Sequence, residues 1–87
     1  GISKLARLGQ AYSLRLQIQE KMTVQTANTI DKVLEPEGVA VVIEASHACM
    51  TARGVRTPGV TMVTSRMMGV FRDDQRSREE VLKLMGH

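Results

Sequence analysis

The run from Val39 to Arg53 restricts the possible folds of this chain more than any other segment. Its first half is rich in β-branched residues and its side chains vary with a period of two, which predicts a β-strand that reaches about residue 52. Alternate residues of a strand point to the same face. One face would therefore hold His47, Cys49, Thr51 and Arg53. An imidazole, a thiol and a guanidinium gathered on one face are more typical of a reaction pocket than of a core stripe.

The segments before this strand predict helices. Apolar residues at near-helical spacing indicate one helix over residues 4–14 and a longer one that ends at Glu35-Pro36-Glu37-Gly38. Residues 14–17 contain neither Gly nor Pro, so a single bent helix is the alternative to the two helices that we favour.

The segments after the strand predict a hairpin and a last helix. Residues 53–59 are rich in turn-forming residues, and a second strand, antiparallel to the first, is expected from about residue 60 to residue 71. Ser77 and Glu80 form a capping-box pattern, which predicts a short C-terminal helix. Two helices, an antiparallel β-hairpin and a short C-terminal helix place the chain in the α+β class.

The composition indicates one small domain with a weak core. Among 87 residues only Tyr12 and Phe71 are aromatic, so we expect the domain to rely on neighbouring chains. A net charge of +3 without an aromatic stacking platform argues against nucleic-acid binding. No apolar run approaches the roughly 20 residues that cross a bilayer. A lone cysteine fits a reducing compartment, so we expect a cytoplasmic protein.

Ser3, Lys4 and Arg7 lie at the start of the first predicted helix. Two cations three residues apart share a helix face, in a first turn whose dipole favours negative charge. An anion bound there would resolve this conflict, which makes the turn a candidate phosphate site. A solvated helix start is the simpler alternative.

Gln19 and Glu20 lie in the opening turn of the second predicted helix. A carboxylate in that position complements the helix dipole, which is the simpler explanation. The alternative is that Glu20 accepts two parallel hydrogen bonds from the N1–H and the exocyclic amine of a guanine.

Cys49 on a strand is commonly a small buried apolar residue, but His47 beside it adds a chemical alternative. Neighbours on one strand face are about 6.5–7 Å apart, while zinc bonds measure about 2.0–2.3 Å. Ligation by Cys49 with proton transfer by His47 is therefore easier than joint ligation. The chain offers too few ligands for a complete zinc site. Arg53 could hold phosphate oxygens or cover a solvated loop.

Six separated segments resemble, in order and spacing, the C-terminal half of the GTP cyclohydrolase I subunit. They are Gly1–Arg7, Arg15–Thr23, Glu44–Met50, Ala52–Val55, Val63–Ser65 and Gly69–Arg72. The resemblance spans essentially all of residues 1–87. Departures from the family pattern are Leu14, where an Arg is usual, and the loop residues 57–60.

The resemblance implies a zinc-dependent hydrolase that opens the imidazole ring of GTP and releases formate. The product would be 7,8-dihydroneopterin triphosphate, at the first step of folate or pterin biosynthesis. It also implies the tunnelling fold and a toroidal homodecamer with active sites between subunits. Residues 1–87 would form the C-terminal part of a single catalytic domain, without its upstream strands and zinc-ligand segment.

The resemblance also implies residue roles. His47 would be a catalytic acid or base and Cys49 a Zn²⁺ ligand, with the other ligands upstream of Gly1. Glu20 would anchor guanine, helped by Gln19 and Ser3. The triphosphate would be held by Lys4, Arg7 and Arg53. We therefore expect these 87 residues alone to be inactive and to retain little metal.

Two other functions are alternatives. One is a tunnelling-fold paralogue that binds a purine or pterin without turnover. The other is a fragment that only joins an oligomer.

Overall fold

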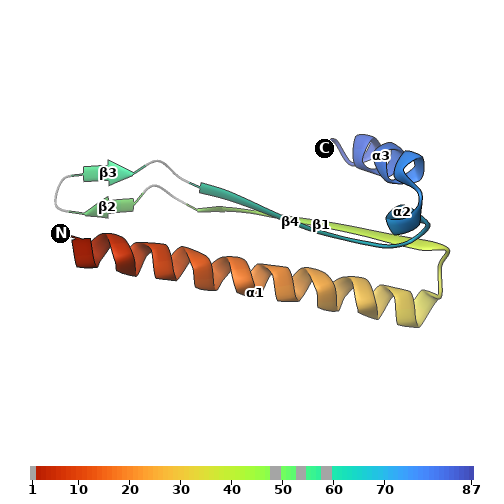
Figure 1. Cartoon of the computed structure of the whole chain (residues 1–87), viewed down its shortest axis with the longest axis horizontal. Helices are drawn as coiled ribbons and strands as arrows, with labels where there is room; N and C mark the ends of the chain where they lie inside the picture. Colours follow the sequence, from red (N-terminus) through yellow and green to blue (C-terminus); the bar gives the residue numbers. More distant parts are fainter. Residues whose placement is uncertain (1, 48–49, 53–54, 58–59) are drawn as a thin grey trace.

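The computed structural model describes residues 2–47, 50–52, 55–57 and 60–87. Side chains are described for the same residues except 2, 4, 5, 8, 47, 50–52, 55–57 and 60. Figure 1 shows a long helix beside a long hairpin, followed by two short helices. In chain order the elements are α1 (Ile2–Leu34), β1 (Gly38–His47), β2 (Met50–Ala52), β3 (Val55–Thr57), β4 (Val60–Gly69), α2 (Val70–Asp73) and α3 (Gln75–Leu84).

α1 is one continuous helix of 33 residues, and the predicted division into two helices near residues 14–17 is wrong. Those residues are Leu-Arg-Leu-Gln, all good helix formers, and the hairpin runs alongside the helix (Figure 1). The helix ends at Leu34, and Glu35 takes a positive φ of 46° before Pro36, which cannot continue a helix.

The predicted antiparallel hairpin is confirmed. β1 pairs with β4 from Gly38↔Gly69 to His47↔Val60, and β2 pairs with β3 from Met50↔Thr57 to Ala52↔Val55. The two residue numbers of every pair add to the same value, so the short ladder continues the register of the long one. Part of the expected connection over residues 53–59 is therefore strand.

The second long strand ends two residues earlier than expected. Gly69 has a φ of 64° and a ψ of −131°, a conformation that L-residues with side chains rarely adopt. The chain turns there, so Val70 and Phe71 belong to α2 instead of β4.

The predicted short C-terminal helix is confirmed, with a different cap. Asp74 is the N-cap of α3, because its carboxylate accepts a 3.1 Å hydrogen bond from the Arg76 backbone N–H. The Ser77 hydroxyl donates to the same carboxylate over 2.8 Å. Ser77 was expected to begin the helix, but Asp74, three residues earlier, is the residue whose side chain caps it.

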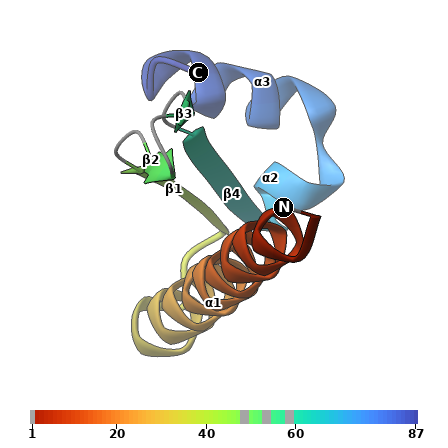
Figure 2. The same ribbon diagram turned by 90° about the vertical axis from the view of Figure 1, so that its left-hand side faces the viewer.

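The hairpin lies between α1 on one side and α3 on the other (Figures 1 and 2). Among the described side chains the buried apolar ones are Ala27, Val39 and Met62, a small core for a chain of this length. The arrangement is α+β and matches part of the tunnelling fold. α1 is long but too polar to cross a membrane, and no other helix in the described ranges is long and apolar enough to do so.

Candidate functional site

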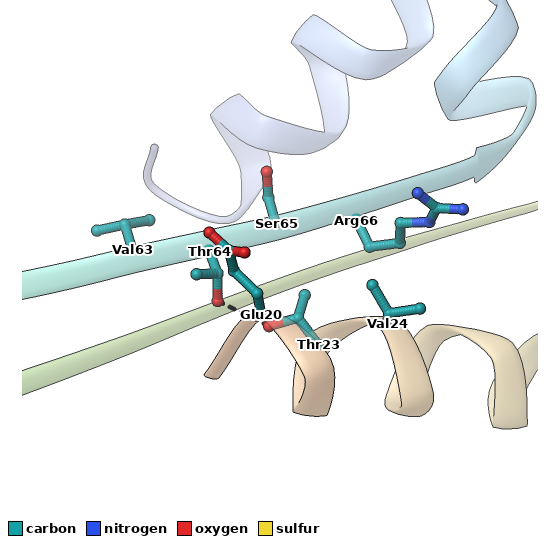
Figure 3. A pocket seen from close by; sticks show the side chains of 7 residues that line it. All are labelled: Glu20, Thr23, Val24, Val63, Thr64, Ser65 and Arg66. Atoms are coloured by element: carbon teal, nitrogen blue, oxygen red, sulfur yellow. Dashed lines mark hydrogen bonds between the residues drawn. The ribbon is translucent and has the colours of Figure 1, made fainter. Parts of the chain in front are cut away.

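A hollow of about 340 Å³ opens between α1 and β4 (Figure 3). From α1 it is lined by Glu20, Thr23 and Val24, and from β4 by residues 63–66. Glu20 is exposed and extends from the helix toward the strand. The residues that line the hollow include the carboxylate-bearing Glu20, two threonines and Arg66, while the Ser65 hydroxyl points away from α1 (Figure 3). Such a set can accept and donate hydrogen bonds to a polar ligand.

Beneath this hollow, three buried polar side chains join α1 to the hairpin. Gln19, Thr23 and Thr64 are 7%, 1% and 7% exposed. The Gln19 amide nitrogen donates to the carbonyls of Ile43 (3.0 Å) and Met62 (3.1 Å) and to the Thr64 hydroxyl (3.2 Å). Because carbonyls only accept hydrogen bonds, the end of the amide that faces them must be the NH₂ group.

The two threonine hydroxyls complete this network. The Thr23 hydroxyl donates to the Gln19 carbonyl over 2.8 Å, and the hydroxyls of Thr23 and Thr64 are 2.7 Å apart. A hydroxyl has one hydrogen, and that of Thr23 is already used, so Thr64 is the donor between the two. The direction of every hydrogen bond is thereby determined.

Of the predicted guanine contacts, Glu20 lies in the hollow and Gln19 lies below it. The two hydrogens of the Gln19 amide are engaged by the chain itself. Sequence reasoning missed Thr23 and Thr64. The available signal was the spacing of Gln19, Thr23 and Ala27, which are four residues apart and therefore share one face of the helix. Ala27 is fully buried, so this face packs against the rest of the chain.

The predicted phosphate contacts on α1 lie at its far end. Ser3 and Arg7 are exposed, and the Lys4 side chain is outside the described set. Arg7 precedes Glu20 by 13 residues, which corresponds to about 20 Å along the axis and roughly 220° of rotation. Ser3 is about 25 Å from Glu20 by the same geometry. One copy of the chain therefore does not bring Ser3 and Glu20 to the same base.

The predicted catalytic residue lies at the end of the long ladder of the hairpin. His47 is the last residue of β1 and pairs with Val60, and its side chain is not described. Cys49 and Arg53 lie outside the described residues. Within the ranges that the structure describes, no three His, Cys, Asp or Glu side chains gather in a way that could hold a metal ion.

A second hollow of about 340 Å³ opens on the other flank of α1. Its lining is mainly apolar and comprises Arg15, Ile18, Gln19, Met22, Ile43 and Ala45. The buried Gln19 side chain therefore separates a polar hollow from an apolar one.

Arg72 and Asp73 form an ion pair that does not line either hollow. The pKa of the Asp73 carboxyl is lowered mainly by the hydrogen bond from Arg72 and, to a smaller extent, by the positive charge of Arg72. This pair is exposed on α2 and has no part in the candidate site.

The fold and the hollow define an α+β domain in which a long helix presents a carboxylate beside an antiparallel hairpin. The sequence model of the family described as GTP cyclohydrolase I matches residues 1–86, and the chain belongs to this family.

Curated relatives agree over the full chain. It is 53% identical over 87 residues to "GTP cyclohydrolase 1 2" of Nostoc sp., covering 100% of the chain and 40% of the relative. It is 54% identical over 87 residues to GTP cyclohydrolase 1 of Gloeobacter violaceus, covering 100% and 41%. The rat protein of that name is 54% identical over 85 residues, covering 98% and 35%. The chain therefore spans about two fifths of the length of these relatives.

Proposed function

We propose that residues 1–87 form the C-terminal part of a GTP cyclohydrolase I catalytic domain. The reaction is hydrolytic opening of the GTP imidazole ring, with release of formate and formation of 7,8-dihydroneopterin triphosphate. The observation that carries this proposal is the exposed Glu20 carboxylate in a polar hollow, within a chain that matches the family over residues 1–86.

Glu20 is the proposed guanine anchor. A carboxylate accepts two parallel hydrogen bonds, and the guanine edge offers two parallel donors, N1–H and the exocyclic amine. Thr23 and Thr64 line the same hollow, but their hydroxyls are engaged with each other and with Gln19, so the Glu20 carboxylate is the group that we assign to the base. The hollow is open, so a nucleotide can enter with its sugar and phosphates directed outward.

Lys4, Arg7 and Arg53 are the proposed triphosphate contacts, with Ser3 beside the nucleotide. Because Ser3 and Arg7 are about 20–25 Å from Glu20 along one helix, we assign them to a site that another copy of the chain completes. A toroidal homodecamer with active sites between subunits accounts for this arrangement.

His47 is the proposed acid or base, and Cys49 the one zinc ligand from these residues. The remaining ligands would come from residues that precede this region in the longer relatives. Zinc bound there would supply an activated water. The proposed setting is cytoplasmic, in folate or pterin biosynthesis.

The test is formate release from GTP by the full-length protein that contains these residues, supplied with zinc. Glu20→Gln should lower kcat/KM for GTP about 100-fold, because two hydrogen bonds to a charged acceptor are together worth about 3 kcal/mol. Glu79→Gln is the matched control, since Glu79 lies on α3 and is exposed, accepting from Gln75. No formate from the parent protein, or equal activity of the two variants, would refute the proposal.

A further inference from the structure

We propose that Thr23 and Thr64 are positioning residues for Glu20. Together with Gln19 they form a closed ring of hydrogen bonds that holds the Glu20 turn of α1 against the middle of the hairpin. This inference rests on the proposed role of Glu20 in guanine binding and names the groups that set its geometry.

The ring runs in one direction through three residues. The Gln19 amide donates to the Thr64 hydroxyl, which donates to the Thr23 hydroxyl, which donates to the Gln19 carbonyl. Each hydroxyl donates once and accepts at least once, so no buried hydroxyl in the ring lacks a partner. Hydrogen bonds connected in this way strengthen one another in a site that excludes water.

The ring encloses the turn that carries Glu20. Gln19 immediately precedes Glu20, and Thr23 follows it by three residues, so the turn is attached on both sides. Gln19 also reaches both long strands through Ile43 and Met62. The turn is therefore fixed to β1 and β4 at once.

Glu20 itself has no comparable support. In the described part of the chain, no hydrogen bond or ion pair holds its carboxylate. The position of that carboxylate is consequently set through the backbone of its turn. A paired contact to a planar base requires placement within about 0.5 Å, which a buried and fully bonded ring can provide.

The same ring changes the role of Gln19. Its two amide hydrogens face three acceptors within the chain, so none is free to donate to a base. Gln19 then acts on guanine through Glu20, as a positioning residue instead of a direct contact.

Thr64→Val in the full-length protein is the first test, because it keeps the shape of the side chain and removes the hydroxyl. The measurement is kcat/KM for GTP and for inosine triphosphate, which lacks the exocyclic amine that Glu20 would bind. A misplaced Glu20 should reduce the preference for GTP over inosine triphosphate about tenfold. Thr64→Ser restores the hydroxyl and should restore the preference.

A merely structural role makes a different prediction. Partial unfolding lowers the fraction of active enzyme and reduces both activities equally, leaving the preference unchanged. Thr29→Val is the matched control, since the Thr29 hydroxyl makes the same kind of bond to the carbonyl four residues earlier, over 2.8 Å, but is exposed. It should change neither activity.

Combination with Glu20→Gln separates this inference from the proposed function. If Thr64 acts through Glu20, Thr64→Val should not alter the nucleotide preference further in the Glu20→Gln background. A parent enzyme that releases formate and loses activity in Glu20→Gln, but keeps its preference in Thr64→Val and in Thr23→Val, would overturn the positioning role alone. A parent protein that releases no formate overturns both.

Discussion

At Gly69 the chain leaves the hairpin in a conformation that few other residues tolerate. Its φ is positive, and a Cβ added there would collide with the carbonyl oxygen of Glu37. Gly9, in contrast, lies within α1 with open space around the position of a Cβ. A side chain would therefore be strained at position 69 but is tolerated at position 9.

Gly69→Ala should lower the free energy of unfolding by about 1–3 kcal/mol from backbone strain alone, and further because of the collision. Gly9→Ala should raise it by about 0.5–1 kcal/mol, because Ala loses less backbone entropy in a helix. Thermal unfolding midpoints of the two variants in the full-length protein measure the difference. Equal midpoints would contradict the role assigned to Gly69.

Single residues also mark the limit of sequence reasoning at the site. The carboxylate of Glu20 was predicted as a candidate from its chemistry, and the structure places it in a polar hollow. The threonines below it were not predicted, because a Thr on a helix and a Thr on a strand acquire meaning only when packing brings their hydroxyls to 2.7 Å. Long-range polar contacts of this kind leave no periodic pattern in the sequence.

At the scale of elements, α3 depends on its first turn. Asp74 accepts from the Arg76 N–H and from the Ser77 hydroxyl, so one carboxylate satisfies two donors. The other end closes with hydrogen bonds from Gly86 and His87 to the carbonyls of Lys83 and Leu82, a Schellman-type ending with Gly86 at a positive φ. Both termini of this short helix are therefore capped.

Asp74→Ala should destabilise α3 by about 1 kcal/mol through loss of its N-cap. Hydrogen exchange of the amides in residues 75–84 measures this locally and should accelerate about fivefold. Asp73→Ala is the adjacent control, since Asp73 pairs only with exposed Arg72 among the described residues and such pairs contribute little. Equal exchange in both variants would show that Asp74 does not cap the helix.

The elements themselves were predictable where a pattern was local. The change of period at Pro36 indicated where helix gives way to strand, and the alternation after it indicated the hairpin. The number of helices was not decided by a local pattern, because residues 14–17 contain no helix breaker and helix propensity there favours continuity. The hairpin that runs alongside the whole helix (Figure 1) is a tertiary contact, which no local pattern reveals.

At the scale of the whole molecule, the chain is elongated, 51 × 24 × 17 Å, and leaves much apolar surface uncovered. Leu14, Ile18 and Met22 follow one flank of α1 and are 58%, 52% and 51% exposed. Monomeric proteins rarely leave contiguous apolar surface of this kind in water. The weak core expected from the composition is thus observed.

The isolated 87-residue chain should therefore associate as its concentration rises. Size-exclusion chromatography with light scattering should give a mass above that of a monomer, and Ile18→Lys should reduce it by placing a charge on the exposed flank. Lys32→Ala, a change outside this flank, should not. A monomer at all concentrations for the parent chain would contradict the expectation.

The unbroken register of the hairpin has a consequence for how this family can vary in length. Inserting or deleting one residue within Gly38–His47 or Val60–Gly69 would move every later side chain of that strand to the opposite face of the hairpin. A change in β4 ahead of Thr64 would in this way turn Thr64 away from α1. Matched one-residue changes in both strands would keep each pair of facing residues on the same face of the hairpin. Gaps in an alignment of relatives are accordingly expected beyond these ten-residue arms, where evolution can lengthen the chain without moving Glu20.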